Sequence, residues 1–343
     1  MAKPMIFLKF VLPALAVVLV PSNANANSLA LTVGGVTAGF TLSTFATTLP
    51  GNTGCCSGPF GIAVTSAGTI LVSNGAGSAY VFADVDGQTT SSALFTVSSN
   101  SSTAAYATAG GQAYGAQNGH FVEFTPQGTI DHTLTGVNTS PYLGMWGNPV
   151  NGHIIATSNS GLIDIDPLAN SGAGSFRVIN GQFGDGVSVS PDGATVYMEQ
   201  GDHIIGYNIA TGVQVFDSGA FPTLTGADGS GVITSTNSLN GDIIVNFNGN
   251  SFNTGGIGLL NPTTHAFTVI ASGGTRGDYV SPDTTNGTLF LDYGDTVMRL
   301  SCGPNCSIGG PPPPPSTVPE PSTLALMGTG LSFLGAMVRR VRR

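Results

Sequence analysis

The amino-acid sequence predicts an all-β chain folded as a six-bladed β-propeller, and three observations support this prediction. Glycine supplies 50 of 343 residues and charged residues only 8%, a composition that disfavours helical bundles and coiled coils. Short β-forming runs alternate with turns of Gly, Asn, Asp and Pro through residues 36–301. Comparable runs recur about every 38 to 48 residues, the length of one four-stranded blade.

Six repeating units are expected, each opening with an inner strand. The runs begin at Phe60, Ala104, Leu143, Asp185, Gly229 and Gly277. The fourth unit is the clearest, with strands expected at 187–190, 195–199, 203–208 and 213–217. Turns rich in Pro, Asp and Gly separate them, because glycine accepts positive φ.

The ends of the repeat region predict how the ring closes. The sixth unit has no outer strand before Cys302, whereas a spare strand, 39–46, precedes the first unit. Pairing the two removes the free sheet edges. Because the second unit is degenerate, five or seven blades remain alternatives, as does a two-sheet sandwich.

Most basic residues lie at the two ends of the chain. The part between them has three arginines, no lysine and seventeen acidic residues. This charge excludes nucleic acid and anionic lipid as partners of the body. One interpretation of this excess of acidic residues is that it keeps the body soluble. The functional alternative is that the acidic residues bind cations.

The N-terminus has the order of a secretory signal peptide. Basic residues precede an apolar run at 10–20, and Ala24 and Ala26 form a small-x-small cleavage site. We expect residues 1–26 to direct the chain to the Sec translocon and to be removed by signal peptidase. An uncleaved anchor is the alternative, but the apolar run is short.

A second targeting segment ends the chain. A Pro-rich linker, 309–317, precedes the triplet Pro319, Glu320 and Pro321 and an apolar run at 324–338. The basic cluster that follows consists of Arg339, Arg340, Arg342 and Arg343. A short transmembrane helix would place these arginines in the cytoplasm and the body, 27–308, outside. An ordinary C-terminal membrane anchor is the alternative interpretation.

Residues 318–343 resemble the PEP-CTERM sorting signal of Gram-negative bacteria. The resemblance implies transient anchoring in the inner membrane and recognition of the Pro-Glu-Pro triplet by exosortase. It further implies removal of the helix and transfer of the body to the cell surface or extracellular matrix.

The repeats resemble those of NHL, regucalcin/gluconolactonase and streptogramin-lyase-like propellers, through turn and strand motifs that specify blades and leave activity open. In the enzymes of that group, a divalent metal lies at one side of the central channel. Here Asp185, Asp228 and Asp278 precede the inner strands of three successive units, and their carboxylates are candidate ligands for Ca²⁺. Hydrogen bonding to backbone amides is the alternative role. The first three units lack matching acids, which argues against a complete ring of ligands.

The remaining polar residues form no recognised catalytic motif. Asp84 and Asp86 lack the partners of a calcium loop, and no two histidines have metal-ligand spacing. Trp146 is expected to pack in the core, with stacking on a sugar as the alternative.

Cysteines in an exported chain favour disulfides. The candidates are Cys55, Cys56, Cys302 and Cys306. Cys302 and Cys306 can close a small loop, or the two pairs can cross-link the chain ends.

Three functions follow from these observations. The first is a non-enzymatic surface or matrix protein processed by exosortase. The second is a metal-dependent lyase or lactonase with Ca²⁺ in the channel. The third is a propeller that binds carbohydrate in an exopolysaccharide.

Overall fold

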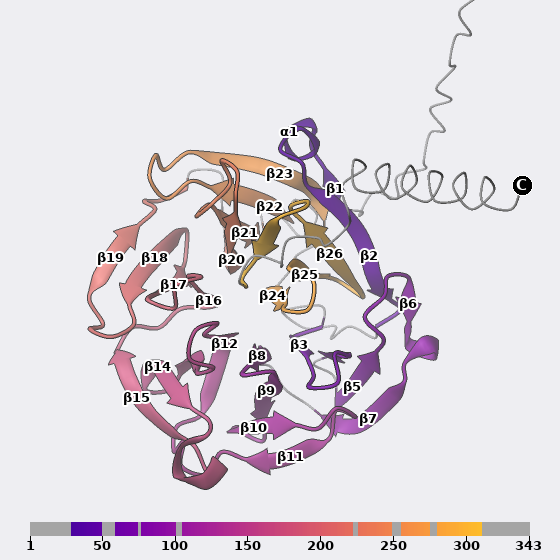
Figure 1. Ribbon diagram of the computed structural model, residues 1–343, viewed down its shortest axis with the longest axis vertical. Helices are drawn as coiled ribbons and strands as arrows, with labels where there is room; N and C mark the ends of the chain where they lie inside the picture. Colours follow the sequence, from indigo (N-terminus) through magenta and orange to yellow (C-terminus); the bar gives the residue numbers. More distant parts are fainter. Residues whose placement is uncertain are drawn as a thin grey trace, which may run out of the picture.

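The chain forms a ring of six mainly antiparallel sheets around a central axis (Figure 1). The computed structural model describes residues 29–49, 59–74, 77–100, 105–221, 226–248, 255–274 and 280–310. Six blades are therefore confirmed, and the two-sheet sandwich is wrong. The signal peptide, Cys55, Cys56, Asp278 and the sorting segment lie outside the described residues.

Blades one to four each have four strands, in order from the axis outward. The first blade has β3 (Gly61–Val64), β4 (Ile70–Ser73), β5 (Gly77–Phe82) and β7 (Phe95–Asn100). The second has β8 (Ala107–Ala109), β9 (Gln112–Gln117), β10 (His120–Phe124) and β11 (Ile130–Thr133). The third has β12 (Pro141–Gly147), β13 (Ile154–Ser158), β14 (Gly161–Asp166) and β15 (Ser175–Asn180). The fourth has β16 (Val187–Val189), β17 (Thr195–Gln200), β18 (His203–Asn208) and β19 (Gln214–Asp217).

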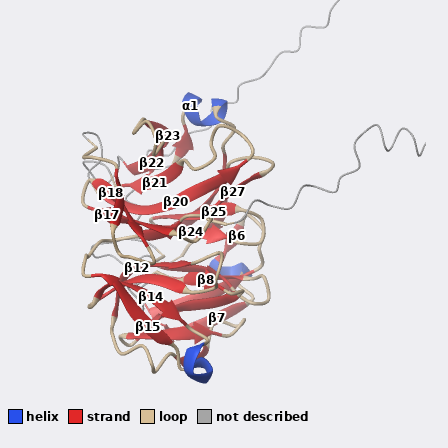
Figure 2. Ribbon diagram, turned by 60° about the vertical axis from the view of Figure 1, so that its left-hand side comes forward, coloured by secondary structure: helices blue, strands red, loops and turns tan. Residues whose placement is uncertain are grey.

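The last two blades recruit strands from both ends of the described chain. The fifth blade has β20 (Ala227–Ser235), β21 (Ile243–Phe247), β22 (Gly255–Leu260) and β23 (Phe267–Gly274), with β27 (Cys306–Ile308) inside and β1 (Ala30–Leu31) outside. The sixth has β24 (Val280–Asp283), β25 (Thr288–Tyr293), β26 (Thr296–Ser301), β2 (Thr41–Thr47) and β6 (Gln88–Thr89). The short helices are α1 (Val33–Thr37), η1 (Thr90–Ser92) and η2 (Ala169–Gly172). Strands dominate the turned view (Figure 2).

The expected N-terminal closing strand is confirmed. β2 pairs antiparallel with β26, with Thr41 opposite Ser301, and supplies the outer strand that the sixth unit lacks. β2 also pairs in parallel with β6 from the first blade, so it joins the last blade to the first. The second unit, degenerate in sequence, is nonetheless a complete four-stranded blade.

Antiparallel pairing gives the ring two distinct sides. Within each blade, the turn between the first and second strands and the turn between the third and fourth lie at the same end of the sheet. In the third blade, for example, Gly147 pairs with Ile154, which pairs with Ile165, which pairs with Phe176. We call this end the turn side and the end where the inner strands begin the entry side.

One strand that the sequence pattern does not predict is β27, which lies inside β20, toward the axis. Ile308 is fully buried and pairs with Ile233 near the turn-side end of β20. The chain then reverses at Gly309, whose φ is +75°. A Cβ atom there would lie 2.3 Å from Cζ2 of Trp146, so only glycine fits this reversal.

The reversed segment remains attached to blade five. Thr234 donates a side-chain hydrogen bond to the carbonyl of Gly310, and the Gly309 amide donates to the carbonyl of Val232. The described chain therefore ends near the axis on the turn side. There Gly309 and Gly310 line a cavity of about 420 Å³ with turns of the second, third and sixth blades.

Candidate functional site

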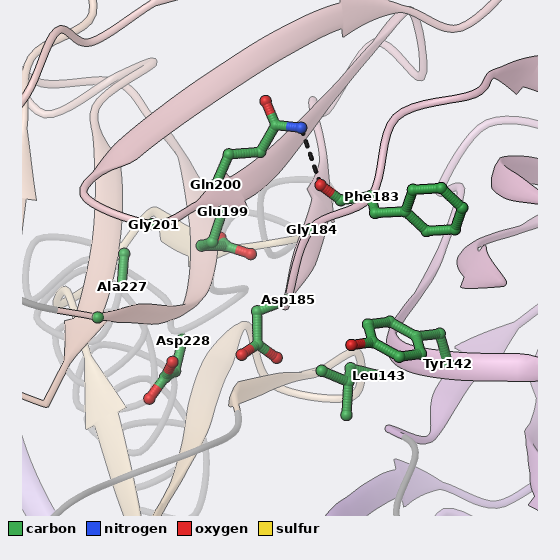
Figure 3. Close-up of a pocket in the computed structure, with 11 residues that line it drawn as sticks. Tyr142, Leu143, Phe183, Gly184, Asp185, Glu199, Gln200, Gly201, Ala227 and Asp228 are labelled. Carbon is green, nitrogen blue, oxygen red and sulfur yellow. Dashed lines mark hydrogen bonds between the residues drawn. The ribbon is translucent and has the colours of Figure 1, made fainter. Parts of the chain in front are cut away.

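A pocket of about 350 Å³ on the entry side is the candidate functional site (Figure 3). It lies where the inner strands β12, β16 and β20 begin and where β17 ends. The carboxylates of Asp185, Glu199 and Asp228 come from these elements, and Tyr142 and Phe183 add aromatic rings (Figure 3). The pocket is thus acidic on one flank and aromatic on the other.

Glu199 is the most unusual residue of this pocket. Its side chain is fully buried, and neither carboxylate oxygen makes a hydrogen bond of normal geometry within the described residues. Burial raises the pKa of Glu199 to about 8, an effect that the Ser230 hydroxyl partly offsets and the Asp185 charge slightly reinforces. At neutral pH the side chain is therefore largely a neutral carboxylic acid, able to donate a hydrogen bond.

Two glycines let this segment pack closely against β17, and one of them makes room for the carboxyl group. A Cβ atom on Gly186 would lie 2.6 Å from Oε2 of Glu199, and one on Gly184 would lie 2.4 Å from Cγ of Met198. The segment is also tied to β17, because the Asp185 amide donates to the Glu199 carbonyl at 2.9 Å. The Gly-Asp-Gly sequence therefore places Asp185 beside Glu199 while leaving space for the Glu199 side chain.

The structure brings two of the three predicted channel acids together. Asp185 and Asp228 line the same pocket, and Asp228 is 5% exposed. Asp278 lies outside the described residues. Sequence reasoning missed Glu199, because its burial in β17 depends on tertiary packing and leaves no signal in the sequence.

The acids of this pocket do not form a ready-made chelate. Among the described residues, only Glu123, Asp131 and His132 bring three ligand atoms within 4.8 Å of one another, and these lie on the outer half of blade two. A cation in the entry-side pocket would require the carboxylates of Asp185, Glu199 and Asp228 to move closer together. The donor set suits such an ion, because all three are hard oxygen ligands.

The structure also places the other candidate residues that the sequence suggested. Trp146 is 1% exposed and packs against the chain reversal at Gly309, so its ring is not available for stacking on a sugar. Cys302 and Cys306 form a disulfide that closes the loop leading into β27. Asp84 and Asp86 pair with Arg299 rather than forming a calcium loop.

The comparisons with known proteins concern two separate parts of the chain. Residues 317–343 match the PEP-CTERM protein-sorting motif. This match shows an exported protein that exosortase processes after transient anchoring in the membrane. Within the described residues, no helix is long and apolar enough to cross a membrane, and the apolar run 324–338 lies outside them.

The body has solved structural neighbours with low sequence identity. A gluconolactonase from Xanthomonas campestris, XC5397, superposes with a TM-score of 0.57 at 14% identity, covering 80% of this chain and 95% of its own. A candidate gluconolactonase superposes with a TM-score of 0.50 at 12% identity, covering 80% of this chain and 97% of its own. At these identities the likeness shows the propeller fold alone. No curated protein matches the chain.

Proposed function

We propose that exosortase processes this exported propeller at Pro319-Glu320-Pro321 and that the released body serves at the cell surface or in the extracellular matrix. There it would act as a non-enzymatic binding scaffold, with polysaccharide as a candidate ligand. The observation that carries this proposal is the sorting motif at residues 317–343, which begins shortly after the last strand of the propeller. Cleavage at the motif would leave every described strand in the product.

Replacing Pro319, Glu320 and Pro321 with alanine in the native host is expected to block processing. The full-length chain, with its C-terminal arginines, should then accumulate in the membrane fraction, because exosortase no longer recognises it. Mass spectrometry of the C-terminal peptide measures this directly.

Alanines at Pro312, Pro313 and Pro314, in the linker, provide the matched control and should leave processing unchanged. Processing would be disproved if the mature wild-type protein also retained Arg339–Arg343.

A metal-dependent lactonase or lyase is the second candidate function, and Glu199 favours it. A buried carboxyl without a hydrogen bond of normal geometry is costly unless a ligand compensates for it. The residues that would hold a divalent cation are Asp185, Glu199 and Asp228, and the bound ion would polarise a lactone carbonyl. The two solved neighbours are described as gluconolactonases, which makes sugar lactones the substrates to test.

Adding Ca²⁺ is expected to raise the melting temperature of the wild-type protein, because an ion that binds only the folded state stabilises it. Glu199→Gln should abolish the shift, since it removes the carboxyl group that would lose its proton and bind the ion, without changing the side-chain volume. Calorimetric melting with Ca²⁺ and with a chelator measures the difference.

Asp131→Asn serves as the control, because it alters the other acidic cluster, on blade two, and should preserve the shift. Loss of the shift in Asp131→Asn, or an unchanged wild-type melting temperature, would contradict a cation site in the entry-side pocket.

A further inference from the structure

Exposed aliphatic side chains gather on the turn side of the ring. Val33 in α1 is 85% exposed, Leu168 between β14 and β15 is 77% exposed, and Val150 between β12 and β13 is 66% exposed. Further large aliphatic residues are exposed at the same ends of their sheets. Seven of these residues, which we call the aliphatic tips, are Val33, Val36, Val85, Ile130, Val150, Leu168 and Val213.

The strand registers place these residues on one side. Val150 follows the end of β12 and Leu168 the end of β14, and the ladder of blade three puts both at its turn-side end. Val85 belongs to the turn whose Asp84 accepts a hydrogen bond from Thr285, in the turn between β24 and β25. The aliphatic tips therefore come from five blades or their flanking helix, on the side where the described chain ends.

The distribution and charge of the aliphatic tips indicate the kind of surface that they fit. Isolated exposed aliphatic residues are ordinary, but these are spaced around one side of a ring rather than lining a groove. Separate tips of this kind suit a broad, deformable surface better than a peptide. The described turns on this side contain no lysine or arginine, so anionic headgroups gain nothing there.

The chain beyond Gly310 would tether the propeller to the membrane. Thirteen residues separate Gly310 from Leu324, where the apolar run begins, and they span at most about 45 Å when fully extended. Until cleavage, an anchored tail holds the turn side close to the bilayer. This tethering raises the effective concentration of the turn side at the bilayer, so contacts that are individually weak can form.

We propose that, before cleavage, the aliphatic tips rest on the bilayer surface and insert at the level of the uncharged lipid interface. The inference rests on the proposed membrane-anchored stage of sorting. In this arrangement the entry-side pocket with Glu199 points away from the membrane and is open to ligands while the protein is still anchored.

Tryptophan fluorescence tests the proposal, because Trp146 is the single tryptophan of the chain and is buried. The full chain without its signal peptide is reconstituted in phosphatidylcholine vesicles whose acyl chains carry bromine. Leu168→Trp places a reporter among the aliphatic tips, and Phe183→Trp places one on the entry side, at a residue that is 55% exposed. We expect brominated lipid to quench the first reporter and shift its emission to the blue, with neither effect for the second.

Two further measurements separate the possible outcomes. Flotation of the vesicles with bound protein reports anchoring by the tail, independently of how the body lies. If the protein floats but Leu168→Trp is quenched no more than Phe183→Trp, docking of the turn side is wrong while anchoring stands. Val150→Asp in the Leu168→Trp protein should reduce the quenching, and unchanged quenching in that variant would also overturn the proposal.

Discussion

Replacing Arg299 with alanine is expected to lower the free energy of unfolding by about 3–5 kcal/mol, the usual cost of leaving a buried charge without its partner. The Arg299 side chain is 12% exposed and pairs with Asp84 from the first blade and with Asp283 from its own. Asp283 is fully buried, and burial is the main cause of its raised pKa. Without Arg299, the carboxylates of Asp84 and Asp283 would repel each other.

Arg299 also packs over two aromatic rings that contact each other. Its guanidinium carbon lies 5.0 Å from the ring centre of Phe45, in β2, and 4.9 Å from that of Phe290, in β25. The residue thus joins the closing strand, the sixth blade and the first blade at the point where the ring is completed. We expect the loss of Arg299 to disrupt the closure of the ring before the rest of the fold.

Arg177→Ala is the matched control, and urea unfolding measures both variants. The Arg177 side chain is 47% exposed, and its partner Asp164 retains a 2.8 Å contact with His153. Its loss should therefore cost less than about 1 kcal/mol. Equal costs for the two variants would show that the Arg299 cluster does not stabilise the ring closure.

Glu199→Gln is expected to stabilise the protein at alkaline pH and to have little effect near pH 5. Burial raises the pKa of Glu199 from 4.5 to about 8, so the folded state binds this proton more tightly than the unfolded state. Its contribution to stability is complete below about pH 4.5 and is lost as the pH rises toward 8. Each pKa unit corresponds to about 1.4 kcal/mol, so a shift from 4.5 to about 8 should let the variant gain up to about 5 kcal/mol at pH 9.

Chemical unfolding between pH 5 and pH 9, in the presence of a chelator, measures this difference. Glu123→Gln makes the same substitution on blade two and serves as the control. A constant difference between Glu199→Gln and the wild type at all pH values would show that folding does not raise the pKa of Glu199.

Blade number and closure were predictable from the sequence because both depend on local, repeated signals. Turns such as Pro191-Asp-Gly recur at blade spacing, and Gly193 adopts the positive φ, +70°, that this turn requires. The missing outer strand of unit six and the spare strand at 39–46 then left one natural pairing. The degenerate second unit left five or seven blades open, and its four strands in the structure decide for six.

The features that sequence reasoning missed depend on tertiary context. β27 is three residues long, too short for a periodic signal, and its pairing with β20 arises only once the ring has formed. Glu199 stands in a strand pattern that marks it as polar, yet burial and the lack of a normal hydrogen bond decide its chemistry. Asp185 and Asp228 were found because their position before inner strands repeats from unit to unit.

The inner position of β27 determines how the body bears mechanical load. A pull on the linker, from the bilayer or from an attachment formed after cleavage, reaches the pairing of β27 with β20 before it reaches β26. The disulfide between Cys302 and Cys306 lies between those two strands and limits how far the chain can extend there. Tension therefore enters near the axis and is resisted by the fifth blade, so the β2–β26 seam that closes the ring is not the first element to peel. A load applied through the C-terminal tail is therefore carried by the fifth blade and spares the closure of the ring.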